Sequence, residues 1–209
     1  MLPKLIFQCS ILKPKKDDSQ SITSSFRFQI GNITFNNVTF AEHDTNIFKD
    51  ILFVAASGKV AFINCMIQFR IIPVINIIAD EVIFESSMLK WLDENSIKIH
   101  ANQVTFSNTS LKEPLEHSMK EIVSNGDQNS TLKLLNVNVE DPKSGTFVSM
   151  FPKVILQNIT VNKCFCGYTL EDITCKDTDF KSQHDRSGFA TLTVNCSKLS
   201  VRPLPKIFT

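Results

Sequence analysis

The sequence has little tyrosine, tryptophan, glycine or net charge. Tyr and Trp occur once each, Gly occurs six times in 209 residues, and the formal net charge is +1. The balanced charge argues against nucleic acid or an anionic membrane as an electrostatic partner. No apolar run approaches the roughly 20 residues of a membrane-spanning helix. The length is that of one domain.

Motifs of familiar chemistry are lacking as well. The chain has no Gly-x-Gly-x-x-Gly, no phosphate-binding loop, no Gly-x-Ser-x-Gly and no His-Glu-x-x-His. Its four histidines are scattered along the chain. We therefore predict no cofactor, no metal and no catalytic residue.

The beginning of the chain is a poor secretory signal. Its apolar stretch is interrupted by Gln8 and followed by Lys13, Lys15 and Lys16, without a small-residue cleavage site. The chain is therefore intracellular, or a fragment whose true beginning is missing. This segment leaves both alternatives open.

Phenylalanine and asparagine, in contrast, recur in a repeat. Phe occurs 17 times and hydrophobic residues make up 43% of the chain, enough for a sizeable core. The pattern apolar-x-apolar-x-Asn-x-x-apolar recurs with its second apolar residue at Phe35, Phe62, Phe84, Phe106, Leu134 and Leu156. These positions advance by 27, 22, 22, 28 and 22 residues. A period of 22 with two short insertions explains all the intervals.

Alternating apolar positions flank each copy of the repeat. The pairs that follow it are Val38/Phe40, Cys65/Ile67, Ser87/Leu89, Thr109/Leu111, Val137/Val139 and Ile159/Val161. The sets that precede it are Phe26/Phe28/Ile30, Phe53/Ala55/Ser57, Ile75/Ile77/Ala79, Ile97/Ile99/Ala101 and Phe147/Ser149/Phe151. The fifth coil lacks the preceding set, and Pro114–Val123 has the spacing of a short helix.

Such alternation predicts strands with one buried face, each paired with the same strand of the next coil. We therefore predict an all-β chain, a single parallel β-helix of about six 22-residue coils over residues 26–163, with an insertion at 112–130. An ordinary β-sandwich and a leucine-rich solenoid are the alternatives. The leucine-rich repeat fits less well, because its Asn lies one residue further from the apolar pair.

The repeated asparagines predict a stacked ladder. They are Asn37, Asn64, Asn108, Asn136 and Asn158, and Ser86 takes the remaining position. We expect these side chains to point inward and to hydrogen-bond the asparagines of neighbouring coils, because buried amides need partners.

At this point the sequence resembles a known family. Val104-Thr-Phe-Ser-Asn-Thr-Ser-Leu111 and Val60-Ala-Phe-Ile-Asn-Cys-Met-Ile67 look like coils of the right-handed parallel β-helix of pectin-lyase-like proteins. The resemblance covers about residues 26–161. It implies a right-handed winding, and for the enzymes of the family a groove of acidic and basic residues on the first strand of each coil.

That groove is not evident in this sequence. The expected outward residues are Arg27/Gln29, Val54/Ala56, Asn76/Ile78, Lys98/His100 and Val148/Met150. They include no carboxylate, whereas glycoside hydrolysis needs two and calcium needs oxygen ligands. Asp80 and Glu81 lie together in one turn without counterparts in neighbouring coils. A catalytic role is therefore not predicted.

The two ends differ from the repeat. Residues 1–25 are expected to be a polar lead-in or an N-terminal cap. Residues 164–209 contain Cys164, Cys166, Cys175 and Cys196, which we interpret as disulfide cysteines of a C-terminal cap or of the start of a further domain. Zinc is the alternative, although Cys-x-Cys is too close for usual ligand spacing. The tail 194–206 resembles the cysteine-bearing start of an extracellular leucine-rich domain.

The chain has six Asn-x-Ser/Thr sequons, about twice the chance expectation, and three of them are ladder positions. We expect the ladder sequons Asn37, Asn108 and Asn158 to be buried and unglycosylated. The candidate glycosylation sites are Asn32, Asn129 and Asn195.

The predicted outward face is unusually apolar. Val54, Ala56, Ile78, Val148 and Met150 suggest a surface covered by a protein partner, by a neighbouring domain or by another part of this chain. We therefore predict a non-enzymatic extracellular or cell-surface scaffold or recognition module, possibly a fragment of a larger protein. The alternative is a carbohydrate-active β-helix enzyme or a polysaccharide-binding protein. A third possibility is a partial or non-functional product.

Overall fold

The computed structural model is a parallel β-solenoid of about five turns whose repeats lie about 22 residues apart. It describes residues 4–8, 11–12, 26–41, 52–68, 75–92, 96–114, 121–141, 150–162, 168–170, 173–176, 179–184, 190–195 and 200–201. These ranges contain strands and turns and no helix. The predicted single parallel β-helix is confirmed, with about five turns where about six coils were expected.

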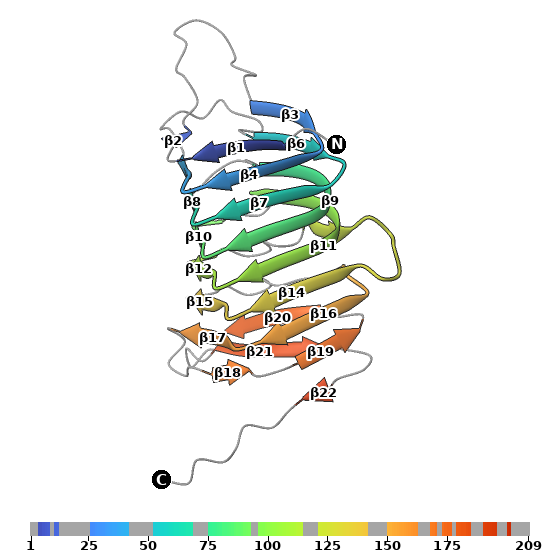
Figure 1. The fold of residues 1–209 in the computed structure, drawn as a ribbon. Helices are drawn as coiled ribbons and strands as arrows, with labels where there is room; N and C mark the ends of the chain where they lie inside the picture. Colours follow the sequence, from blue (N-terminus) through green and yellow to red (C-terminus); the bar gives the residue numbers. More distant parts are fainter. Residues whose placement is uncertain are drawn as a thin grey trace, which may run out of the picture.

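One long sheet carries the motif strands, which lie stacked from β1 to β16 in Figure 1. Its strands are β1 (Lys4–Gln8), β4 (Asn32–Asn36), β7 (Lys59–Ile63), β9 (Ile75–Glu85), β11 (Ile97–Ser107), β14 (Thr131–Leu135) and β16 (Lys153–Gln157). All these pairs are parallel, and the register aligns the predicted column from Phe35 to Leu156.

The same sheet continues around a bend, because β9 and β11 are each 11 residues long and reach both sides. The N-terminal part of β9 pairs with β6 (Leu52–Ala56), which in turn pairs with β3 (Phe26–Ile30). The N-terminal part of β11 pairs with β13 (Ile122–Ser124) on the other side. The expectation that the fifth coil lacks this stretch was wrong, since β13 places buried Ile122 beside Ile99. Ile122 and Val123, expected in a helix, are therefore in a strand.

A second sheet of short strands closes each coil. Its strands are β2 (Ile11–Leu12), β5 (Thr39–Ala41), β8 (Met66–Gln68), β10 (Met88–Lys90), β12 (Ser110–Lys112), β15 (Asn138–Glu140), β17 (Ile159–Asn162) and β18 (Tyr168–Leu170). Inward residues such as Phe40, Ile67 and Leu89 are fully buried.

The core is built from columns of like side chains. The rings of Phe35, Phe62, Phe84 and Phe106 stack with centroid distances of 5.0, 4.8 and 4.7 Å. All four are 0% exposed. Burial of one such ring contributes about 1.5–3 kcal/mol, and each aromatic pair adds about 0.5–1.5 kcal/mol. Parallel in-register pairing brings identical positions together, so the repeat itself produces the stack.

The first strand of the second coil has the opposite register from the one predicted. Phe53, Ala55 and Ser57 were expected inside, but Leu52 and Val54 are fully buried and pair with Ile75 and Ile77. Both alternating sets are possible from sequence. The observed one places a small residue, Ala56, where the next coils have Ala79 and Ala101, and it leaves the Ser57 hydroxyl out of the core.

The pairing direction changes after β17. β18 pairs antiparallel with β17, and β19 (Ile173–Lys176) pairs antiparallel with β16 and with β22 (Ser200–Val201). β20 (Asp179–His184) and β21 (Ala190–Asn195) form a separate antiparallel pair. The structure does not describe the side chains of the four cysteines predicted to form disulfides, which are Cys164, Cys166, Cys175 and Cys196. Their disulfides and the C-terminal cap therefore stay a prediction.

Candidate recognition surface and asparagine corner

The outward side chains of β3, β6 and the N-terminal parts of β9 and β11 form one continuous surface, called here the outer face. Cross-strand register sets its two columns, which are Arg27–Phe53–Asn76–Lys98 and Gln29–Ala55–Ile78–His100. The second column continues to Val123 of β13 and by an isolated bridge to Met150. Ile78 is 45% exposed and Met150 is 65% exposed.

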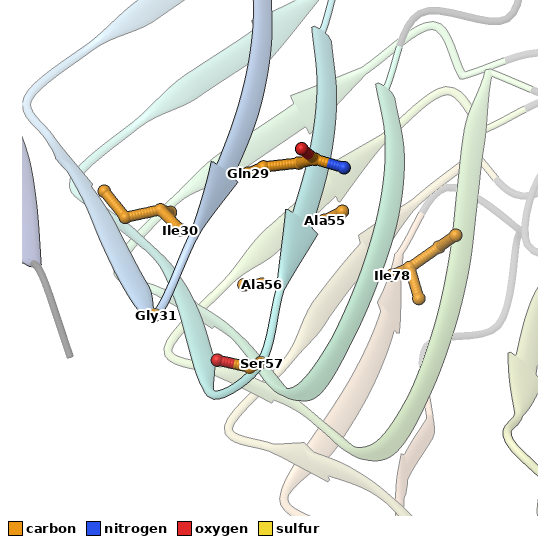
Figure 2. Close-up of a pocket in the computed structure, with 7 residues that line it drawn as sticks. All are labelled: Gln29, Ile30, Gly31, Ala55, Ala56, Ser57 and Ile78. Carbon is orange, nitrogen blue, oxygen red and sulfur yellow. The ribbon is translucent and has the colours of Figure 1, made fainter.

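An open hollow of about 470 Å³ lies on this face. Figure 2 shows the side chains of Gln29, Ala55 and Ile78 on three neighbouring strands, with the shortest of them in the middle. The hollow exists because Ala55 and Ser57 are small and lie between larger neighbours. Its accessible lining is mostly apolar, which suits an aliphatic or aromatic side chain better than a polar ligand.

A second hollow of about 480 Å³ adjoins it and is lined by Arg27, Phe28, Gln29 and Phe53. The Arg27 guanidinium lies 6.0 Å from the centre of the Phe53 ring, at the outer range of a cation–π contact. Phe53 was expected in the core, and no pattern in its own coil revealed its outward position.

The two columns of the outer face hold the cations Arg27 and Lys98, together with His100, and no carboxylate. Two carboxylates border them. Asp80 is exposed at the next outward position of β9 after Ile78, and Glu121 precedes β13 beside Lys98, where its carbonyl accepts a hydrogen bond from the Ile99 backbone. No group of three possible metal ligands occurs within the part of the chain that the structure describes.

Asp80 and Glu81, the turn carboxylates, interact with neighbouring coils. The Asp80 carboxylate accepts a hydrogen bond of 2.8 Å from Asn102 Nδ2, and Glu81 lies 3.5 Å from Lys59 Nζ. Their backbone amides both donate to the Gly58 carbonyl. These contacts join one coil to the next and do not form a pair of carboxylates across a groove.

The exposed apolar residues differ in part from those predicted from the sequence. Ile78 and Met150 are exposed as expected, whereas Val54 and Ala56 are buried because of the register of β6. Val148 lies outside the described residues. Phe53 and Ala55, both half-buried, take the outward places in that coil.

The asparagine ladder is present, but it lies outside the core. Asn136 Nδ2 donates to Asn108 Oδ1 over 3.1 Å, and Asn158 Nδ2 donates to Asn136 Oδ1 over 2.9 Å. All five ladder asparagines are exposed, so the prediction that they point inward was wrong.

Backbone conformation explains the outward position. The ladder residues have φ between 51° and 57°, and Ser86 has a φ of 49°. Asn adopts this left-handed conformation more readily than other non-glycine residues. The chain bends at each such residue, here called the corner, and the side chain of the following residue enters the core.

The residues after the corner supply the buried polar contacts. The Ser87 hydroxyl donates toward the carbonyls of Phe62 and Glu85 at 3.2 and 2.9 Å, and it accepts from the Cys65 amide at 3.0 Å. Thr109 contacts the Phe84 and Ser107 carbonyls in the same way. Cys65 is buried as predicted, and burial raises the pKa of its thiol above the ordinary 9.0.

The corner position also changes the interpretation of the sequons. Asn37, Asn108 and Asn158 are exposed, which removes the reason for expecting them unmodified. Among the other candidates, Asn129 is exposed, and the side chain of Asn195 is outside the described residues. Asn32 is half-buried, and its Oδ1 accepts a hydrogen bond of 2.8 Å from the Lys59 amide.

Comparison with known proteins matched no family model, no curated protein and no solved structure. Within the described ranges, no helix is long and apolar enough to cross a membrane.

Proposed function

We propose that this chain is a non-enzymatic recognition module that binds a protein partner through the outer face. The observation that carries the proposal is the exposed Ile78 beside the hollow over Ala55, in a column that continues to exposed Met150. Adjacent apolar side chains on a flat sheet are costly to leave in water, and a protein side chain would cover them.

The flanking charges indicate what the partner would present. Arg27 and Lys98 lie in the column next to Ile78, and His100 follows it in the same column. A complementary surface would carry an apolar side chain flanked by Asp or Glu. The proposal includes a right-handed, pectin-lyase-like winding, an extracellular or cell-surface location, disulfides, and glycosylation at Asn32, Asn129 or Asn195.

Selection from a displayed random-peptide library tests the proposal. We expect enriched peptides that place an aliphatic or aromatic residue beside acidic residues, with binding that weakens as salt concentration rises. Ile78→Asp should abolish their binding. Gln103→Asp is the matched control, because Gln103 is exposed on the motif part of β11, in the next turn, and lies away from the outer face. Equal binding to both variants would refute the proposal.

The alternative is a carbohydrate-active enzyme of the same fold, favoured only by the resemblance of the coils. Incubation with acidic polysaccharides in the presence of calcium separates the two, with new reducing ends and unsaturated products as the readouts. We expect no turnover above the buffer control. Robust turnover would overturn the non-enzymatic reading.

A further inference from the structure

The asparagine ladder is interrupted at one coil, and the interruption forms a hollow. Ser86 occupies the ladder position between Asn64 and Asn108, as the backbone hydrogen bonds from Asn64 to Glu85 and from Ser86 to Ser107 establish. The hollow has a volume of about 330 Å³, within the roughly 300–1,000 Å³ of ligand pockets. It lies at the corner after the motif strands, away from the outer face.

Hydrogen-bonding groups on both sides of this gap are unused. In the intact part of the ladder each Nδ2 donates to the Oδ1 of the preceding coil. Asn108 Oδ1 accepts in this way, but its Nδ2 has no hydrogen bond with a described residue. The carboxamide of Asn64 also has none among the described residues, where only its backbone amide donates, to the Glu85 carbonyl.

The spacing of the coils fits one inserted amide. Neighbouring parallel strands are about 4.8 Å apart, so that two coils separate Asn64 from Asn108 by about 9.6 Å. Ladder amides in adjacent coils hydrogen-bond at 2.9–3.1 Å. A single amide placed over Ser86 can therefore accept from Asn108 Nδ2 and donate to Asn64 Oδ1.

The remaining lining selects the kind of amide. Met66 and Met88 lie side by side in β8 and β10, each two residues after the corner of its own coil, and Met66 is 38% exposed. Thioether side chains adapt to small apolar groups such as a methyl. The hydroxyls of Thr39 and Ser110 lie at the ends of the same hollow and suit sugar hydroxyls.

We infer that this gap binds the acetamido group of an N-acetylated amino sugar. The carbonyl of the acetamido group accepts from Asn108 Nδ2, its N–H donates to Asn64 Oδ1, and its methyl contacts Met66 and Met88. This site does not depend on the proposed protein-binding role of the outer face.

Saturation-transfer NMR with tri-N-acetylchitotriose, on the full chain, tests the inference. We expect the strongest transfer at the acetyl methyl protons and a shift of the Asn108 side-chain amide signals, with a Kd on the order of 1 mM as befits few polar contacts. Cellotriose, which lacks the acetamido groups, should give neither effect. Equal effects from both sugars, or none with chitotriose at 10 mM, roughly tenfold above that Kd, would overturn the inference.

Two variants at one position give the matched comparison. Ser86→Asn fills the gap with an amide of the chain itself and should weaken binding about tenfold, the effect of losing two exposed hydrogen bonds. Ser86→Ala keeps the hollow and should leave binding nearly unchanged. Free glutamine is the competing probe: if it displaces chitotriose from the wild type, the site accepts primary carboxamides of peptides and the sugar assignment is wrong.

Discussion

Substitution of Asn136 tests whether the corner requires a left-handed backbone. Asn136 has a φ of 53°, donates to Asn108 and accepts from Asn158. Ala and Gly both remove these two exposed hydrogen bonds, which we take as about 0.5 kcal/mol each, the low end of the usual range. They differ in the backbone, because a residue with a Cβ loses about 1–2 kcal/mol in this conformation and Gly loses none.

At Asn136 the Gly variant should be more stable than the Ala variant, which is the reverse of the usual order. At most positions Gly is less stable than Ala by about 0.5–1 kcal/mol, since glycine loses more chain entropy on folding. At Asn136 the steric cost of Ala exceeds that entropic cost of Gly. We therefore expect Asn136→Ala to be less stable than Asn136→Gly by about 0.5–1 kcal/mol, with total losses of roughly 2–3 and 1.5–2 kcal/mol.

Urea denaturation followed by circular dichroism measures the difference as a shift of the midpoint at constant slope. Asn138 supplies the control, because it lies two residues further on, inside β15. There Ala should be more stable than Gly, the ordinary sign. An Asn136→Ala variant that is as stable as Asn136→Gly would refute the conformational explanation of the ladder.

Two further stability measurements follow from the core. Among the described residues, Phe84 stacks on both Phe62 and Phe106, whereas Phe106 stacks on Phe84 alone. Phe84→Leu should therefore lower the free energy of unfolding by about 0.5–1.5 kcal/mol more than Phe106→Leu, as measured by denaturant unfolding. Equal losses would contradict a contribution from stacking. Burial holds the folded pKa of Cys65 above the ordinary 9.0, so the unfolded chain loses this proton first and stability should fall as the pH rises beyond about 9. This fall should approach about 1.4 kcal/mol per pH unit and should be absent in Cys65→Val, so that it appears as the difference between the two proteins when unfolding is measured at pH 7 to 11, a range set by these pKa values.

The solenoid and its main core column were predictable because one physical rule governs both. Parallel strands of successive coils pair position by position, so a period of 22 residues in sequence becomes a column in space. Phe35, Phe62, Phe84 and Phe106 follow this rule, and their stacking confirms it. The inward positions of Cys65, Ser87 and Thr109 were predictable for the same reason.

The register of β6 was not predictable from its own residues. Leu52/Val54/Ala56 and Phe53/Ala55/Ser57 both alternate, and a change of one residue moves every side chain to the other face. The choice depends on the neighbouring coils, which supply alanines at the end of this strand. The hollow on the outer face could not be predicted either, since it is formed by small residues that become neighbours only in the fold.

The outward direction of the ladder asparagines was not predicted, because the prediction considered the hydrogen bonds of their side chains and not the positive φ of their backbone. Gly occurs only six times, yet a solenoid with tight bends needs residues that tolerate positive φ. A regularly spaced Asn in a glycine-poor chain is the signal that could have located the corners.

At each corner the ladder residue is exposed and the next residue is buried, which explains how the ladder can lack one asparagine. The residue that follows each corner satisfies buried carbonyls: Ser87 contacts the Phe62 carbonyl from inside, next to the gap at Ser86. The ladder amides are exposed, so losing one of them leaves no buried polar group without a partner. A gap therefore costs little stability here, whereas the same gap in a buried ladder would be strongly destabilising. Ser86→Asn should accordingly stabilise the fold only modestly, by about 0.5–1 kcal/mol, while it weakens binding at the acetamido site. A much larger gain would mean that the gap is a defect of the core and would weaken the case for a ligand there.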